Sequence, residues 1–416
     1  MIRENIGPGI DRHSWPNGLR LVTEPVPGSR TVALGLWIAA GSRLEPPPKH
    51  GVAHLLEHMF FKGTADHDAE SLALAMNALG GHFNAFTSQE TICLHTRVID
   101  EHFERALELL VGQLRRSLFD DGELERERSV ILEEIKLTND TPDDLIHDLF
   151  QESLWGEHGL GRSVLGTPET VSALRRGDLL TFIEHEFLPS RLVVAIAGAV
   201  DPIRAAALVE EFLGDLVERN GGGTPLVPPI PGHAVCHTHR STEQMHFCLG
   251  GDAPNRLDES RYAFNLLNSI LGGGTSSRIF QEIRERRGLA YAIGSFLEGF
   301  QDSGCFGISG GTSPGALPEV LGCCRAQIDR VCREPVSPAE LRNAKEQMRA
   351  HLLLSLESMN HRMSRLAELE LHFGRHIPLE ETLARIEAVT ADDILDVARR
   401  HLAEGPRVIT TLGPGA

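Results

Sequence analysis

The sequence contains no uninterrupted apolar run approaching the ~20 residues that a transmembrane helix requires. We therefore expect no membrane-spanning segment. Residues 1–18 lack the apolar core of a signal peptide and the Arg-rich, acid-poor composition of a mitochondrial transit peptide. The default expectation is a cytoplasmic location in a bacterium, with a presequence removed before residue 1 left open as the alternative.

An excess of positive charge is also missing. The 40 Lys and Arg residues against 58 Asp and Glu residues give a formal net charge of −18. Non-specific binding to nucleic acid requires a basic surface, so we expect no nucleic-acid partner. The same charge disfavours binding to anionic membrane surfaces.

The cysteines form no recognisable disulfide framework. There are seven of them, an odd number, and their spacing is irregular. Free thiols in a reducing compartment therefore fit this pattern better than disulfide bonds do.

The composition is that of a globular protein, with 41% hydrophobic and 24% charged residues. A chain of 416 residues is too long for one ordinary domain, and domains of about 100–200 residues are typical. A Gly- and Pro-rich segment at 221–235 interrupts helical and strand-like text. We predict an N-terminal domain at 1–220, a linker at 221–235 and a C-terminal domain at 236–416.

The two predicted domains look like duplicates. Aligning the Glu-Leu pair at 123–124 with the one at 340–341 gives an offset of about 217 positions, and aligning Arg191 with Arg407 gives about 216. Strand-like and helical segments interleave in both halves without strict βαβ alternation. This pattern predicts an α+β fold, in which each domain has a mostly antiparallel sheet with helices packed on one face.

The motif H-x-x-E-H at residues 54–58 is the first candidate for chemistry. On a helix, His54 and His58 share one face with Cβ atoms roughly 6 Å apart, so both imidazoles can reach one Zn²⁺. Glu57 projects near the same face and can act on water without binding the metal. Because His is frequent in this sequence, the motif alone leaves open a helix with two exposed histidines.

A second candidate is the Glu-rich helical segment that follows about 70 residues later. Glu127 and Glu134 are seven residues apart, two helical turns, and therefore share a face. One can bind a metal while the other supports the site by hydrogen bonding. Glu133 is the alternative ligand, and a solvated charged helix is the alternative reading of the whole segment.

These motifs occur together with GGHFNAFTSQET at 80–91 and GGGTSSRIFQEIRERRGLAY at 272–291. The combination resembles the pitrilysin/insulinase family of zinc peptidases, which includes the β subunit of mitochondrial processing peptidase and bacterial homologues of similar length. H-x-x-E-H is the signature of such inverted zinc sites. The resemblance implies that His54, His58 and Glu134 bind one Zn²⁺ per chain. It also implies that Glu57 is the general base and that Glu127 supports the ligands.

The other two segments carry implied roles in substrate binding. In the family, the stretch matching 80–91 is a sheet edge to which substrate adds as a further strand, which makes Phe83, Asn84 and Ala85 candidate substrate contacts. The R-x6-Y pair, Arg284 and Tyr291, would hydrogen-bond substrate carbonyls or the developing oxyanion. From the residues alone, 272–291 also fits an exposed basic helix that ends at Gly288.

The second half carries no metal motif of its own. The repeat offset places His351 and Ala344 near the positions equivalent to Glu134 and Glu127, and no H-x-x-E-H occurs there. Cys236, His237 and His239 have metal-capable side chains, but no fourth ligand is in register, so we expect no second metal site.

Taken together, the sequence and the resemblance predict a zinc metalloendopeptidase that hydrolyses unstructured peptides in a chamber formed by two subunits. A homodimer would suffice, because His54 and Tyr291 could then come from opposite subunits. A heterodimer with an inactive paralogue stays open. The alternative function is that of a catalytically silent structural or partner subunit with the same fold.

Overall fold

The computed structural model describes residues 1–218 and 223–415, so positions 219 to 222, at the end of the predicted N-terminal domain and the start of the predicted linker, lie outside it. The chain divides into two compact units, and each unit draws segments from both halves of the sequence. The first unit comprises Met1–Ile135, Ser163–Leu226 and Leu353–Pro378. The second comprises Lys136–Arg162, Val227–Leu352 and Leu379–Ala416.

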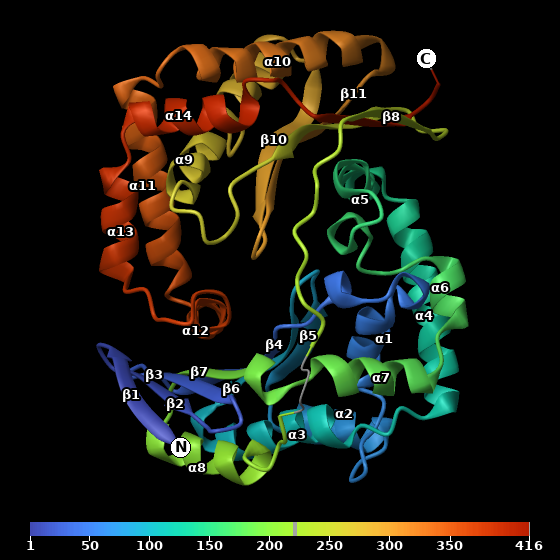
Figure 1. Ribbon diagram of the computed structural model, residues 1–416, viewed down its shortest axis with the longest axis vertical. Helices are drawn as coiled ribbons and strands as arrows, with labels where there is room; N and C mark the ends of the chain where they lie inside the picture. The colour runs from blue at the N-terminus through green and yellow to red at the C-terminus, as the bar shows by residue number, and fades with distance from the viewer. Residues whose placement is uncertain (219–222, 416) are drawn as a thin grey trace. The chain divides into compact units, whose positions relative to one another are not determined.

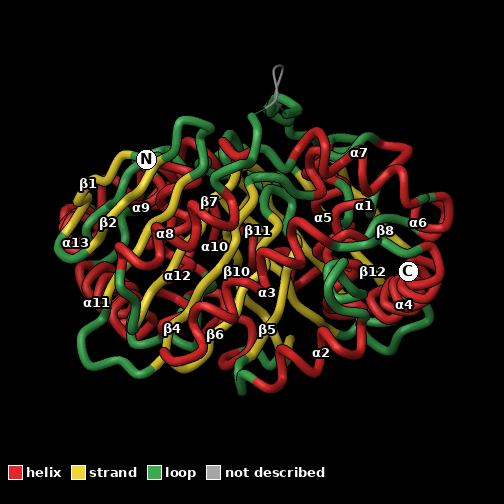
Figure 2. The backbone as a smooth tube through the Cα atoms, turned by 90° about the horizontal axis from the view of Figure 1, so that it is seen from below, coloured by secondary structure: helices red, strands yellow, loops and turns green. Residues whose placement is uncertain are grey.

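The first unit is built on a sheet that has seven strands among the described residues, in the order β1-β2-β3-β7-β4-β6-β5. Neighbouring strands are antiparallel except for the parallel pair β3 and β7. Figure 2 shows β4, β6 and β5 running side by side, with β5 at the edge. The bounds are β1 Ile2–Gly7, β2 Ile10–Ser14, β3 Arg20–Pro25, β4 Thr31–Ile38, β5 His82–Thr87, β6 Ile92–Ile99 and β7 Leu192–Gly198.

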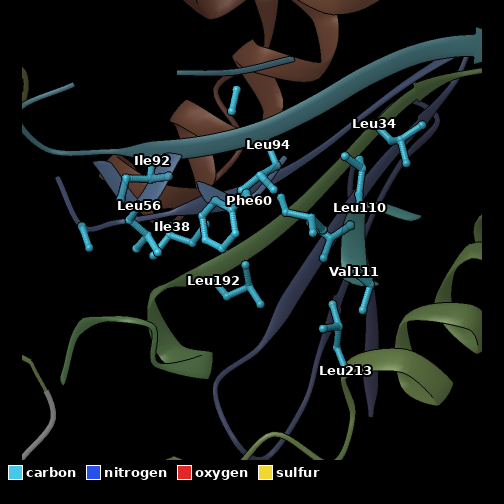
Figure 3. Close-up of a cluster of buried hydrophobic side chains, with 14 of the residues drawn as sticks. Leu34, Ile38, Leu56, Phe60, Ile92, Leu94, Leu110, Val111, Leu192 and Leu213 are labelled. Carbon is cyan, nitrogen blue, oxygen red and sulfur yellow. The ribbon is translucent and has the colours of Figure 1, made fainter. Parts of the chain in front are cut away.

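Most helices of this unit pack on one face of the sheet and enclose the main core. Figure 3 shows part of that core, where Leu56 and Phe60 lie close to Ile38 and Ile92 of the sheet. A fully buried Leu or Phe side chain contributes about 1.5–3 kcal/mol, so this packing fixes the helix that carries residues 54–58. The bounds are α1 Val52–Met59, α2 Ala69–Ala78, α3 Phe103–Arg116, α4 Asp121–Asn139, α6 Pro168–Ala173, α7 Arg176–Glu186 and α8 Pro202–Leu213.

The other face of the first sheet is covered by α12, Met359–Phe373, which comes from the C-terminal half of the sequence (Figure 1). The Trp37 indole N–H points to Sδ of Met363 at 3.1 Å. The buried Glu370 carboxylate lies 3.6 Å from Arg12 and 3.5 Å from Arg20. Because helices cover both faces, the central strands β4 and β7 are buried along almost their whole length, and after Thr31 their residues do not alternate between apolar and polar.

The second unit repeats this plan. Its sheet has the strand order β10-β11-β9-β12-β8 among the described residues, and only β12 and β8 are parallel. Here α5, from the N-terminal half, covers the face opposite the other helices, and its Trp155 meets Phe300 edge-on at 5.4 Å. The strands are β8 Ala234–His239, β9 Met245–Asp252, β10 Ala290–Gly299, β11 Gly304–Thr312 and β12 Val408–Gly413. The helices are α5 Pro142–Trp155, α9 Arg261–Leu271, α10 Leu317–Arg333, α11 Pro338–Ser355, α13 Leu379–Ala388 and α14 Ala391–Leu402.

The α+β fold class with two related, mostly antiparallel sheets is thus confirmed. The structure adds one helix on the second face of each sheet, exchanged between the two halves of the sequence. All seven cysteines are free thiols, as expected. Within residues 1–218 and 223–415, no helix combines the length and the apolar character needed to cross a membrane.

Candidate metal centre

Helix α1 positions both histidines of the H-x-x-E-H motif. It begins after Gly51, whose φ of 94° lies in the left-handed region. A Cβ atom at this position would lie only 2.9 Å from the carbonyl oxygen of Leu165, so the site favours glycine. The buried Glu45 carboxylate accepts hydrogen bonds from the backbone N–H groups of Gly51, at 2.9 Å, and Ala53, at 2.7 Å. Glu45 therefore caps the first turn of α1 and satisfies donors that the helix itself cannot.

One group of His and carboxylate side chains in the described residues converges closely enough to hold a metal ion. It consists of His54, His58 and Glu134, whose donor atoms lie within 4.8 Å of one another. Oε2 of Glu134 is 3.7 Å from Nε2 of His54 and 3.6 Å from Nε2 of His58. Glu134 comes from α4, so the group joins two helices that are far apart in sequence. The alternative ligand, Glu133, is exposed and does not belong to this group.

These distances fit a tetrahedral zinc site. Zinc ligands at ~2.0–2.1 Å in tetrahedral geometry lie roughly 3.3 Å from one another. The two separations between Glu134 and the histidines, 3.7 and 3.6 Å, exceed this value by only a few tenths of an ångström. Two histidines and one glutamate are a ligand set typical of catalytic zinc, which keeps its fourth position for water or substrate. The donor atoms therefore suit Zn²⁺ in both chemistry and spacing.

Glu127 contacts Nδ1 of His58, the ring nitrogen that is not near Glu134. Its Oε2 is 2.9 Å from Nδ1 of His58, and its Oε1 is 2.7 Å from Nζ of Lys62. Burial alone would raise the pKa of Glu127, but its contacts with Lys62 and His58 lower the pKa below the usual value. An ionised carboxylate can only accept, so Nδ1 of His58 carries the proton and Nε2 offers its lone pair.

His54 and Glu57 have the protonation behaviour that the chemistry needs. Burial, and to a smaller extent the neighbouring His58, lower the pKa of His54 to about 4, so its imidazole is neutral and able to bind a metal near neutral pH. Burial raises the pKa of Glu57, and contacts with Thr87 and His58 only partly offset this effect. A raised carboxylate pKa suits a general base.

The predicted substrate strand is β5, which lies at the edge of the first sheet. Opposite residues of two antiparallel strands alternate between hydrogen-bonded and non-hydrogen-bonded pairs. Ser88, which directly follows β5, donates its N–H to the Thr91 carbonyl at 2.8 Å, so this pair is hydrogen-bonded. Phe83, Ala85 and Thr87 therefore occupy non-hydrogen-bonded positions, and their main-chain N–H and C=O groups point away from β6. The open edge of β5 can thus accept a further strand.

The three predicted substrate contacts fall on different faces of β5. Phe83 and Ala85 pack towards the main core, whereas Asn84 is exposed on the opposite face. Oδ1 of Asn84 accepts a hydrogen bond from the Ala85 N–H at 3.0 Å. One of the edge donors is therefore satisfied within the strand itself.

Arg284 and Tyr291 lie together in the second unit. Arg284 is on the π-helix Phe280–Arg286, and its Cζ is 4.9 Å from the centroid of the Tyr291 ring. Tyr291 is 80% exposed on edge strand β10, where the pairing with β11 is irregular between Ala290 and Ile293. Such irregularities redirect side chains, which leaves the phenol accessible. Their predicted role in catalysis stays a prediction.

The remaining candidates do not form a site. Among the described residues, Cys236, His237 and His239 belong to no group with metal-ligand spacing. His237 instead contacts the Thr411 hydroxyl at 3.0 Å. At the repeat positions of the second half, His351 is exposed on α11 and Ala344 is buried.

Sequence reasoning missed three residues around this centre: Glu45, Lys62 and Thr87. Lys62 had a local signal, because it follows His58 by four residues and so lies near the same side of the chain. Glu45 had none, since an acidic residue seven positions before the start of a helix is not a recognised cap. Thr87 lay within the 80–91 segment but was not singled out.

Comparisons with known proteins identify relatives of this chain. Residues 20–168 match the family described as Insulinase (Peptidase family M16), and residues 173–348 match the Peptidase M16 inactive domain. The chain is 38% identical over 395 residues to the uncharacterized zinc protease YmxG of Bacillus subtilis, covering 95% of this chain and 96% of that protein. It is 39% identical over 414 residues to an uncharacterized zinc protease of Streptomyces coelicolor, covering 97% and 90%.

Solved structures share the fold at lower identity. A peptidase M16 inactive domain from Pseudomonas fluorescens superposes with a TM-score of 0.90 at 22% identity, covering 98% of both chains. A protease from Helicobacter pylori gives a TM-score of 0.89 at 21% identity, covering 98% of this chain and all of the other.

Proposed function

Because this chain belongs to the insulinase family, peptidase family M16, we propose that it is a zinc-dependent endopeptidase with one Zn²⁺ per chain. The observation that carries the proposal is the convergence of His54, His58 and Glu134 beside Glu57. When bound there, zinc supplies the Lewis acidity that activates water and polarises a peptide carbonyl.

The chain's own residues supply the remaining chemistry. The Glu57 carboxylate takes a proton from the attacking water and delivers it to the leaving amine nitrogen. Glu127 keeps the imidazole of His58 oriented. The open edge of β5 holds an extended peptide through main-chain hydrogen bonds, which recognise any sequence, so unstructured peptides are the proposed substrates.

We further propose that two subunits enclose the substrate. The two related sheet-and-helix units of this chain would form one half of such an enclosure, and a second copy would form the other. A heterodimer with an inactive paralogue is the alternative assembly. Size-exclusion chromatography with light scattering would distinguish a monomer from a dimer.

The test of the function pairs metal content with cleavage. We expect about one zinc per purified chain and cleavage of a quenched fluorescent peptide that stops with a chelator and returns with Zn²⁺. Zinc without cleavage of any peptide would favour a missing partner or a narrow specificity. Absence of both zinc and cleavage would support the catalytically silent subunit instead.

Arg284 and Tyr291 are proposed to stabilise the substrate carbonyl or the oxyanion. Tyr291→Phe is expected to lower kcat/KM about 100-fold, the effect of losing one oxyanion donor, with zinc content unchanged. Arg284→Ala should act in the same direction. The matched control is Tyr262→Phe, because Tyr262 also contacts an arginine: Arg261 donates to its hydroxyl at 2.9 Å. Equal kinetics for Tyr291→Phe and the parent would leave these residues a structural role only.

A further inference from the structure

Lys62 completes a chain of contacts that ends at a metal ligand. It lies one turn beyond His58, just after α1, where its backbone N–H donates to the Met59 carbonyl at 3.2 Å. Its Nζ is 2.7 Å from Oε1 of Glu127, while Oε2 of the same carboxylate is 2.9 Å from Nδ1 of His58. Each oxygen of Glu127 thus has its own partner.

The two contacts of Glu127 together fix the orientation of its carboxylate. With only one hydrogen bond, a carboxylate can still rotate about its last side-chain bond, and the histidine that it contacts can tilt with it. Glu127 is only 6% exposed, so little water is available to satisfy its second oxygen. With Lys62 on that oxygen, the carboxylate plane is fixed and its buried charge is compensated.

We propose that Lys62 is a positioning residue of the metal centre, which holds Glu127 so that Glu127 in turn fixes the imidazole of His58 with Nε2 directed at the ion. The inference rests on the proposed function, because it concerns the same zinc site. It goes further in assigning a role to a cation that touches neither the ion nor the substrate.

The first experiment measures metal release instead of catalysis. Zinc transfer from the protein to a chromophoric chelator is followed for the parent, Lys62→Met and Lys62→Arg. Residues that orient zinc ligands typically change metal affinity by about 10–100-fold, so Lys62→Met should release zinc about 10-fold faster. Lys62→Arg keeps a cation on Oε1 and should recover most of the difference.

Lys49 provides the matched control. Its Nζ forms an ion pair with Asp178 at 2.8 Å, and it lies three residues before α1, but it does not contact Glu127 or a ligand. Lys49→Met therefore removes a comparable ion pair near the same helix, and zinc release should match that of the parent. Equal effects of Lys49→Met and Lys62→Met would mean that the loss of any ion pair close to α1 loosens the site, which overturns the proposal.

A double-mutant cycle with Glu127 tests the route of action. If Lys62 acts only through Glu127, then Lys62→Met should add nothing to the faster release caused by Glu127→Gln. Effects that multiply in the double variant would overturn the proposal. The absorption spectrum of the Co²⁺-substituted protein gives a second readout, because a tilted His58 ligand changes the visible bands.

The outcomes separate this inference from the proposed function. A parent protein that binds no zinc or cobalt refutes both. A parent that binds zinc, together with Lys62→Met that releases it at the parental rate, refutes only the role of Lys62. Thermal unfolding of the metal-free proteins identifies any variant that fails to fold. If Lys62→Met is one of them, Lys62→Gln, which also removes the cation from Oε1, takes its place, and zinc release at the parental rate would overturn the role of Lys62.

Discussion

Glu57→Gln is expected to lower kcat by about 10²–10⁴-fold while zinc content stays at the parental level. The carboxylate lies near the same face of α1 as the two histidines, but among the described residues it belongs to no group of metal donors. Glutamine keeps the size and a hydrogen-bonding oxygen of the side chain but removes its negative charge and its ability to take a proton. Loss of the base should therefore appear in turnover and not in metal binding.

The measurement combines steady-state kinetics on a fluorescent peptide with metal analysis of the same sample. Glu70→Gln, at an exposed glutamate in the first turn of α2, serves as the control for removing one negative charge from this unit. Parental turnover in Glu57→Gln would contradict the role of base. Loss of zinc would instead make Glu57 a ligand, and the site would have to be reassigned.

Local spacing predicted the parts of the site that lie on single helices. Helical geometry requires His54 and His58 to share a face, and the structure brings their rings to 4.7 Å between centroids. The same geometry places Glu127 and Glu134 on one side of α4. The meeting of α1 with α4 followed from a family resemblance, because no periodicity relates residues about 70 positions apart.

Contacts between distant segments explain what the sequence could not predict. Helix α12 packs on the first sheet although it is more than 300 residues from β2 and β3, and its partners Arg12 and Arg20 look like ordinary surface arginines. A helical pattern shows which face of α12 is apolar but not which sheet receives it. Lys62 and Glu45 likewise gain their roles only when a partner from another segment arrives.

The choice between Glu133 and Glu134 as the third ligand leads to the second large effect. Glu134→Gln is expected to weaken zinc binding by more than about 100-fold, because even residues that only orient ligands account for about 10–100-fold. An amide is neutral and a poor zinc ligand, and the remaining two histidines cannot hold the ion alone. Competition with a chelator of known affinity measures the change.

Glu133→Gln is the matched comparison, since it makes the same chemical change one residue away on the same helix. Exposed substitutions usually alter stability by within about 0.5 kcal/mol, so we expect about a twofold change in zinc affinity or less. Because adjacent helical residues project about 100° apart, only one of the two carboxylates can reach Nε2 of both His54 and His58. Equal losses in the two variants would indicate a general charge effect, and a larger loss in Glu133→Gln would require α4 to rotate from the position that the structure gives it.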